Sequence, residues 1–141
     1  HETIGFNFKF TELQACIGIE QMKKVSKRVI RKKEIYSLYS KLLSDIDGIT
    51  LFDNNNETTA PWFIDCTATD RENLQKYLKG HHVGTRVMYP PINKQKAYNL
   101  PGEHSVSEFL GVSGLWLPSA VQLLDEEIEY ICGHIRDFYD E

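Results

Sequence analysis

The sequence lacks most features of secreted and membrane-spanning proteins. It has three cysteines, Cys16, Cys66 and Cys132, at wide spacings and without a CxxC pair. An odd number in this arrangement favours free thiols in a reducing compartment, so we expect a cytoplasmic protein with each cysteine as a small core residue. No apolar run approaches the ~18 residues that span a bilayer, and no signal peptide is evident, so we expect no membrane partner.

The sequence also lacks the common catalytic signatures. It contains no G-x-S-x-G, no Walker loop and no G-x-G-x-x-G. Its five histidines have no Cys, Asp, Glu or His partner at a recognisable ligand spacing, which argues against a metal site. With a net charge of −4 over 141 residues, the chain as a whole is no polyanion binder. Its first residue is His1 rather than Met, which fits processing or a longer parent chain.

The first residues carry a clear pattern. Phe6, Phe8 and Phe10 alternate with Asn7 and Lys9, which predicts a strand with two different faces. The segment that follows, Thr-Glu-Leu-Gln, is a capping box and predicts a helix from Glu12. That helix is apolar nearly all round, so we expect it to be well buried.

A long amphipathic helix is predicted next. Its apolar residues recur at spacings of three, four and seven from Met22 to Leu43, and Asp47-Gly48 is expected to end it. Seven of the eleven residues from 23 to 33 are Lys or Arg. A solvated helix face is the favoured interpretation, and a nucleic-acid-binding face is the weaker alternative.

The remainder predicts a small α/β unit. Strands are expected at 61–66, 83–89 and 114–118, and helices from an Asp70 cap to Gly80, over 105–110, and from Asp125 to the end. This order favours a three-stranded sheet with helices on one face. On the middle strand, Arg86 and Met88 share one face, whereas Tyr89 shares the other with Thr85 and Val87. Arg86 suits either a clamp for an anionic or hydroxyl-rich ligand or a surface salt bridge, and the residues alone leave both open.

Three stretches carry a family resemblance over essentially the whole chain. "IGFNFKFTELQACIGIEQM" resembles the G-[YF]-N-[YF]-R block of the DegT/DnrJ/EryC1/StrS sugar aminotransferases. "GTRVMYPPINKQKAYN" and "SGLWLPSAVQLLDEEIEYICGHI" are similar to two later segments of that family. The last resembles the branch that aminates 4-keto-6-deoxy nucleotide sugars, and "MYPPINKQKAY" also resembles enzymes that aminate 8-keto octulosonates, so the substrate stays open.

The resemblance implies a fold and a domain division. It implies the C-terminal part of the aspartate-aminotransferase-like fold, fold type I of the pyridoxal-phosphate enzymes, in the α/β class with a small, mostly antiparallel sheet and helices on one face. Residues 1–22 would end the large cofactor-binding domain with a strand and a buried helix. Residues 23–46 would form a connecting helix, and residues 47–141 a small C-terminal α/β domain.

The resemblance also implies an activity for the whole enzyme. It would use pyridoxal 5'-phosphate to transfer an amino group, from glutamate, to a keto-sugar or nucleotide-linked keto-sugar for surface polysaccharide synthesis. It would act as a homodimer with shared active sites. The Schiff-base lysine would lie upstream of His1, so this chain alone is not expected to be active. A catalytically inactive binding or scaffold module of the same fold is the rival interpretation.

Five positions carry the expected contacts. Asn7 would reach the cofactor phosphate of the neighbouring subunit, and Lys9 stands where the family has Arg. Arg86 and Tyr89 match a region that lines the sugar site, and Asn93 stands where the family often has His. Before the last helix, Leu124 replaces the usual Thr, so Asp125 is expected to act as the cap.

Overall fold

The computed structural model describes residues 11–98 and 101–140. The predicted strand with Asn7 and Lys9 lies outside the described residues. The elements in chain order are α1 (Glu12–Met22), α2 (Val25–Leu43), β1 (Ile49–Leu51), β2 (Ile64–Ala68), α3 (Arg71–Gly80), β3 (Arg86–Val87), the 3-10 helix η1 (Ile92–Lys94), α4 (Ser105–Ser113), β4 (Gly114–Leu117) and α5 (Asp125–Asp140). No helix among these residues is long and apolar enough to cross a bilayer.

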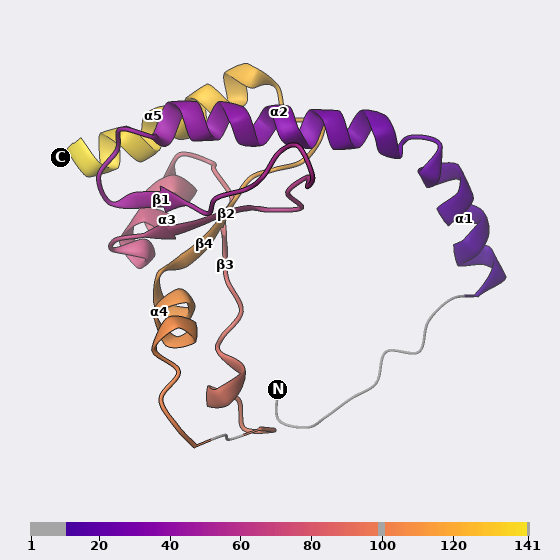
Figure 1. Cartoon of the computed structure of the whole chain (residues 1–141). Helices are drawn as coiled ribbons and strands as arrows, with labels where there is room; N and C mark the ends of the chain where they lie inside the picture. Colours follow the sequence, from indigo (N-terminus) through magenta and orange to yellow (C-terminus); the bar gives the residue numbers. More distant parts are fainter. Residues whose placement is uncertain (1–10, 99–100, 141) are drawn as a thin grey trace.

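The strands form one antiparallel sheet in the order β1-β2-β4-β3. Helices α2 and α5 lie side by side over it, and α3 packs with them against the same core (Figure 1). The fold class predicted from the sequence, a small antiparallel sheet with helices on one face, is therefore confirmed.

The predicted number of strands was wrong, because β1 was missed. This strand has three residues and no extended alternation that could reveal it. It forms because Gly48, with a φ of +99°, turns the chain after α2 and lets Ile49 pair with Ala68. A side chain at Gly48 would meet the ring of Tyr139 at 2.5 Å, so the position requires glycine.

The middle strand is shorter than predicted, since only Arg86–Val87 pair with β4. The residues before them complete the end of α3 instead. The backbone N–H of Val83 donates to the carbonyl of Leu78 at 2.9 Å, and Val83 packs into the core. His82 takes the left-handed turn there, with a φ of +63°, so α3 closes beyond Gly80.

The first helix begins as predicted. Gln14 N–H donates to Thr11 Oγ1, and Thr11 N–H donates to Gln14 Oε1 at 2.7 Å, which completes the capping box. Lys23 and Lys24 separate α1 from α2, so the long helix starts later than the sequence suggested.

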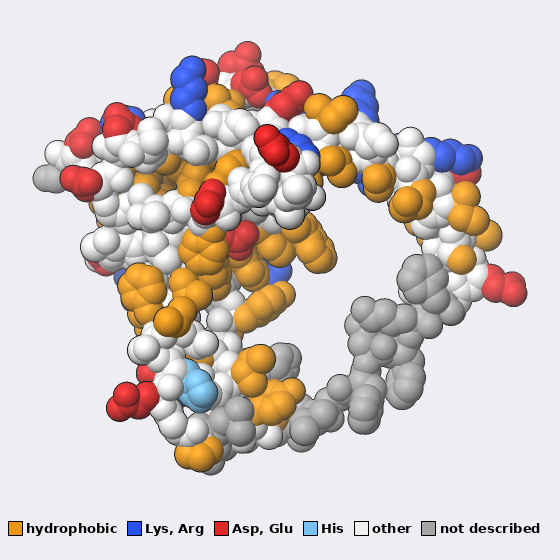
Figure 2. All heavy atoms as spheres, in the orientation of Figure 1, with side chains coloured by type: hydrophobic (Ala, Val, Ile, Leu, Met, Phe, Trp, Pro, Cys, Tyr) orange, Lys and Arg blue, Asp and Glu red, His pale blue; other side chains and the backbone are white. Residues whose placement is uncertain are grey.

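No side chain of α1 is buried by the described residues. Leu13, Ile17, Ile19 and Met22 are all more than half exposed, and Figure 2 shows apolar side chains along this helix. Cys16 is exposed as well, contrary to its expected place in a core. The burial predicted from the apolar composition of this helix therefore does not occur within the described chain.

At two helix starts, the residue predicted as the N-cap makes other contacts. Asp70 precedes α3, but its carboxylate accepts from the side-chain amide of Asn73 rather than from the backbone. Asp125 is the first residue of α5, and it accepts from Arg31 at 2.8 Å. The backbone N–H of Leu124 donates to Glu127 instead, so the prediction of Asp125 as the cap was wrong.

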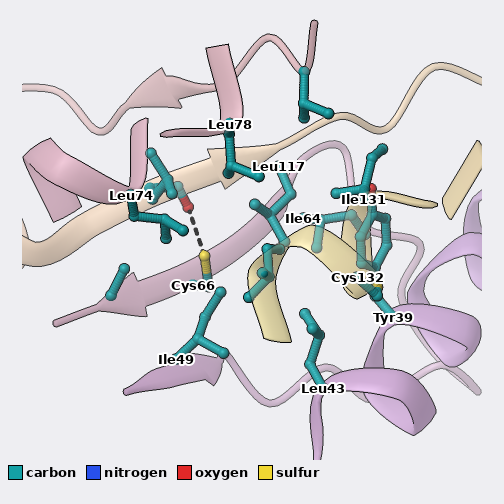
Figure 3. Packing of buried hydrophobic residues seen from close by; sticks show 14 of the residues in the cluster. Tyr39, Leu43, Ile49, Ile64, Cys66, Leu74, Leu78, Leu117, Ile131 and Cys132 are labelled. Carbon is teal, nitrogen blue, oxygen red and sulfur yellow. Dashed lines mark hydrogen bonds between the residues drawn. The ribbon is translucent and has the colours of Figure 1, made fainter. Parts of the chain in front are cut away.

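One hydrophobic core joins the sheet to three helices. Helix α2 contributes Ile35, Tyr39 and Leu43, α3 contributes Leu74 and Leu78, and α5 contributes a stripe that includes Ile131 and Cys132 (Figure 3). Tyr39 is fully buried, and its hydroxyl donates to the carbonyl of Pro118 at 3.0 Å. Burial raises the pKa of this phenol far above its usual range.

Candidate functional site

The sheet has two faces of different chemistry. Ile64 and Cys66 on β2, with Leu115 and Leu117 on β4, point into the core shared with the helices. Because side chains alternate along a strand, Asp65 and Trp116 point to the opposite side. We call this side the open face and define it by Phe63, Asp65, Arg86, Tyr89 and Trp116.

Three residues of the open face form a row across the strands. Asp65 on β2 is the cross-strand partner of Trp116 on β4, and Trp116 is the partner of Arg86 on β3. Directly opposed side chains on one face of a sheet touch one another. The row therefore places a carboxylate, an indole and a guanidinium next to each other.

Trp116 is held on three sides. Its indole N–H donates to Asp65 Oδ1, and its ring stacks on Phe63 with centroids 4.3 Å apart and planes 12° from parallel. The ring of Tyr89 meets it edge-on at 5.2 Å. Trp116 is only 8% exposed although it is not part of the core cluster. The aromatic stack continues outward from Phe63 to Trp62, which is exposed.

Arg86 lies over this aromatic surface. Its guanidinium carbon is 5.4 Å from the ring centroid of Tyr89 and 5.5 Å from that of Trp116, within the range of cation–π attraction. Its Nη2 donates to the Tyr89 hydroxyl at 3.4 Å. Among residues 11–98 and 101–140, no carboxylate pairs with Arg86. The guanidinium therefore keeps N–H donors available for a ligand.

Arg86 and Tyr89 meet although alternation assigned them to opposite faces. That assignment assumed a strand through Tyr89, whereas β3 ends at Val87. Beyond the end of β3 the Tyr89 ring reaches both Trp116 and Arg86. The salt bridge offered as the alternative role for Arg86 has no partner in the described part of the chain.

Asn93 is brought into a different environment. It is 8% exposed, and its amide donates to Glu108 Oε1 at 3.2 Å, which ties η1 to α4. Lys94 lies 3.0 Å from the same oxygen. The hydrogen bond from Lys94, with that from Asn93, lowers the pKa of the Glu108 carboxyl. The Asn93 amide is thus used within the chain, and its role toward a substrate stays a prediction.

The segment between β3 and η1 borders a groove of about 380 Å³. Its lining residues are Tyr89, Pro90, Ile92, Gln95 and Tyr98. Two of these, Tyr89 and Ile92, are more than half exposed. The groove and the open face thus share Tyr89, which links the two parts of the candidate site.

Three residues of the basic run, Arg31, Lys32 and Lys33, make contacts within the chain. Arg31 donates to Asp125 and to the carbonyl of Leu123. The Lys32 ammonium donates to the carbonyls of Trp62 and Ser119, and Lys33 to that of Glu57 at 3.2 Å. Desolvation lowers the pKa of Lys32. These contacts favour a structural role for Arg31, Lys32 and Lys33, whereas Lys24, Lys27 and Arg28 are exposed.

Sequence reasoning missed Trp116 and Asp65. The position of Trp116 between two leucines of a predicted strand was an unused signal for the face opposite the core, and its hydrogen-bond partner lies on another strand 51 residues away. Asp65 within Phe-Ile-Asp-Cys gave a matching signal, since it is the one charged residue between core positions. Among the described residues, no group of His, Cys, Asp and Glu side chains could hold a metal ion.

Comparison with known proteins agrees with the family resemblance of the sequence. The profile of the DegT/DnrJ/EryC1/StrS aminotransferase family matches residues 1–136. The chain is 29% identical over 145 residues to GDP-perosamine synthase of Escherichia coli O157:H7, covering 100% of this chain and 40% of that protein.

Solved structures show the same fold. DesV of S. venezuelae, in complex with a ketimine intermediate, superposes with a TM-score of 0.86 at 23% identity, over 100% of this chain and 40% of that one. GDP-4-keto-6-deoxy-D-mannose-3-dehydratase of E. coli, with bound hydrated PLP, superposes with a TM-score of 0.73 at 18% identity, over 92% and 36%. The chain spans about 40% of the length of the curated relatives it matches.

Proposed function

Because the chain belongs to the DegT/DnrJ/EryC1/StrS aminotransferase family, we propose that it is the C-terminal portion of a pyridoxal-phosphate-dependent sugar aminotransferase. The whole enzyme transfers an amino group, from glutamate, to a keto-sugar or nucleotide-linked keto-sugar for surface polysaccharide synthesis. Support comes from the similarity to GDP-perosamine synthase. That relative is longer, since the match covers only 40% of its length.

The observation that carries this proposal is the exposed guanidinium of Arg86 on an aromatic surface. Arginine forms directional, charge-assisted hydrogen bonds with phosphate and carboxylate oxygens, and the exposed ring of Tyr89 suits the apolar face of a sugar or base. In this proposal Arg86 and Tyr89 bind and orient the substrate. Asn93 acts at the border of the site through the loop that it holds against α4.

Asn7 and Lys9 are proposed to hold the cofactor phosphate. An amide and an ammonium both present N–H donors, which fits a phosphate acceptor. The cofactor, when bound, supplies an electron sink for amino transfer. The lysine that binds it covalently is proposed to lie upstream of His1, in a large domain to which residues 1–22 belong.

The remaining assignments follow from the same proposal. Residues 23–46 connect the large domain to the small domain of residues 47–141. Two subunits share their active sites, since Asn7 reaches the neighbouring one. The exposed apolar side of α1 supports this assembly, because it needs a cover that the described chain does not supply. The three free thiols support a cytoplasmic enzyme.

The coding sequence upstream of His1 gives the first test. A large α/β region with a lysine shortly before Asn7 is expected, and an initiation site directly at His1 would overturn the proposal. The purified full-length protein should then bind pyridoxal phosphate with a visible absorbance band. Mutation of that lysine should remove the band.

Substrate binding is tested by Arg86→Ala in the full-length enzyme. Loss of charge-assisted hydrogen bonds worth about 1.5–3 kcal/mol predicts a KM for the keto-sugar raised about 10- to 150-fold. Arg28→Ala is the matched control, since Arg28 is an exposed arginine of α2, and it should leave KM unchanged. A protein that binds the sugar but neither cofactor nor amino donor would instead be the scaffold module of this fold.

A further inference from the structure

Resting on this function, we propose that Trp116 and Asp65 are positioning residues that fix the guanidinium of Arg86 in its substrate-binding orientation. Trp116 supplies the surface on which Arg86 lies, and Asp65 fixes the orientation of the Trp116 ring. Neither residue contacts the substrate itself in this proposal. The observation behind it is the row Asp65, Trp116, Arg86 across three neighbouring strands.

The orientation of the indole is determined by two independent contacts. The hydrogen bond to Asp65 fixes the rotation of the ring within its plane, because only one edge of an indole carries an N–H donor. The nearly parallel stack on Phe63 fixes the plane itself. One face of the ring is thus defined for Arg86, whose guanidinium carbon lies 5.5 Å from the centroid.

Arg86 needs such support because it has few other restraints. It is exposed, and in the described part of the chain its contacts are the two rings and the Tyr89 hydroxyl. A long side chain that must be ordered when the ligand binds weakens binding by the entropy it loses. Holding the guanidinium against Trp116 beforehand removes part of that loss and leaves its hydrogen-bonding edge toward the ligand.

Asp65 acts through Trp116 rather than directly on Arg86. The two residues lie two strands apart, which is about 10 Å at the usual spacing of strands in a sheet. A carboxylate next to Arg86 would occupy the donors that a substrate anion needs. With the indole between them, Asp65 is engaged by an N–H and the charge of Arg86 stays available.

The surroundings of Trp116 also differ from ordinary core packing. Trp116 is not part of the cluster that joins the sheet to the helices, and its ring contacts are Phe63, Tyr89 and Arg86. A residue with a purely structural role would change stability without a specific dependence on Arg86. A positioning role predicts that dependence, and the two can be separated by a double-mutant cycle.

The test uses steady-state kinetics of the full-length enzyme with its keto-sugar. Trp116→Leu should raise KM about 3- to 10-fold, the range expected for loss of a cation–π contact, with little change in kcat. In an Arg86→Ala background the same substitution should raise KM no further. Asp65→Ala should raise KM by a smaller factor. Asp65→Asn, which keeps an oxygen acceptor for the indole, should restore a KM near that of the wild type.

Trp116→Phe serves if Trp116→Leu fails to fold, because it keeps one stacked ring and loses the N–H donor together with the second ring of the indole. A second readout is the NMR spectrum of the same variants. The indole N–H resonance of Trp116 should move in Asp65→Ala and stay in Asp65→Asn. The δ-protons of Arg86, shifted by the Trp116 ring current, should return toward their ordinary position in Trp116→Leu.

The outcomes separate this inference from the function on which it rests. A KM unchanged by Arg86→Ala would remove Arg86 from the substrate site and overturn the positioning roles with it, whereas a full-length protein without amino transfer would overturn the proposed function. A KM raised by Arg86→Ala, with an effect of Trp116→Leu that is undiminished in the Arg86→Ala background, would overturn only the positioning role. Equal effects of Asp65→Asn and Asp65→Ala would show that Asp65 does not act as an acceptor for the indole.

Discussion

The core face and the open face of the sheet are built from the same strands and carry opposite kinds of chemistry. On β4, Leu115 and Leu117 are almost completely buried among aliphatic side chains, whereas Trp116 between them meets a carboxylate, a guanidinium and two rings. On β2, Asp65 stands between Ile64 and Cys66 in the same way. The comparison teaches that adjacent residues of one strand can belong to the core and to a candidate binding surface, because they face different surroundings.

The largest expected effect is on the core face. Leu115→Ala removes a fully buried side chain from the contact between the sheet and the helices, and should lower the free energy of unfolding by about 2–5 kcal/mol. The matched control is Leu124→Ala, whose side chain is 61% exposed, with a change within about 0.5 kcal/mol. Urea denaturation followed by circular dichroism measures both. Equal losses would mean that the core face is not the main source of stability.

Thiol reactivity provides a second measure of the core face. Burial raises the pKa of both Cys66 and Cys132 to about 12, whereas Cys16 is exposed on α1. The thiolate fraction of the two buried thiols at pH 8 should be on the order of a thousandfold below that of an ordinary cysteine. Ellman's reagent should therefore react quickly with one thiol, and with the other two only after denaturation. Cys16→Ser should abolish the fast phase, and a second fast thiol would show that the core face is open.

Lys32 connects α2 to one end of the sheet. Its ammonium donates to the carbonyls of Trp62 and Ser119, which flank β2 and β4 at the same end of the sheet. Lys32→Met leaves both carbonyls without this donor and should lower the free energy of unfolding by about 1–3 kcal/mol. Lys27→Met, at an exposed lysine of the same helix, should change it by no more than about 0.5 kcal/mol. Chemical denaturation of the two variants measures both free energies of unfolding, and equal values would contradict a structural role of the Lys32 ammonium.

The smallest expected effect concerns the loop next to the open face. Lys94 and Asn93 lower the pKa of Glu108, so their contribution is fully present above the ordinary pKa of a glutamate. It is lost as the pH falls through the lowered pKa, because the protonated carboxyl no longer pairs with Lys94. The side-chain amide resonances of Asn93 should therefore shift only in acid. Glu108→Gln should remove this shift, and a transition at or above the ordinary glutamate pKa would contradict the assignment.

Strongly periodic segments were the predictable part of the fold. The helix α5 was identified because its apolar stripe repeats over its whole length, and the strand at 114–118 because a short apolar run ends at a proline. The capping box located the start of α1 to the residue. The helices on one face followed from the order of these elements.

Features that depend on distant partners were not predictable. Strand β1 has three residues and exists through pairing with β2, and β3 shrank to two residues because Val83 completes the end of α3. The candidate site shows the same limit. Arg86 was selected by its place on the strand and by a resemblance, and Tyr89 by the resemblance, but their contact with each other and with Trp116 arises from tertiary structure. Asn7 and Lys9 lie outside the described residues, so their assignment stays a prediction.

The shortness of β1 and β3 has a consequence for association. The order β1-β2-β4-β3 places a three-residue and a two-residue strand at the two borders of the sheet. Short borders offer little unpaired backbone to an incoming chain, which is one way in which proteins avoid cross-β fibre growth. The chain is therefore expected to resist templated fibrillation. Aggregation of the separated chain should involve the exposed apolar surface of α1. Detergent should therefore reduce the aggregation, whereas a peptide that blocks strand pairing should not.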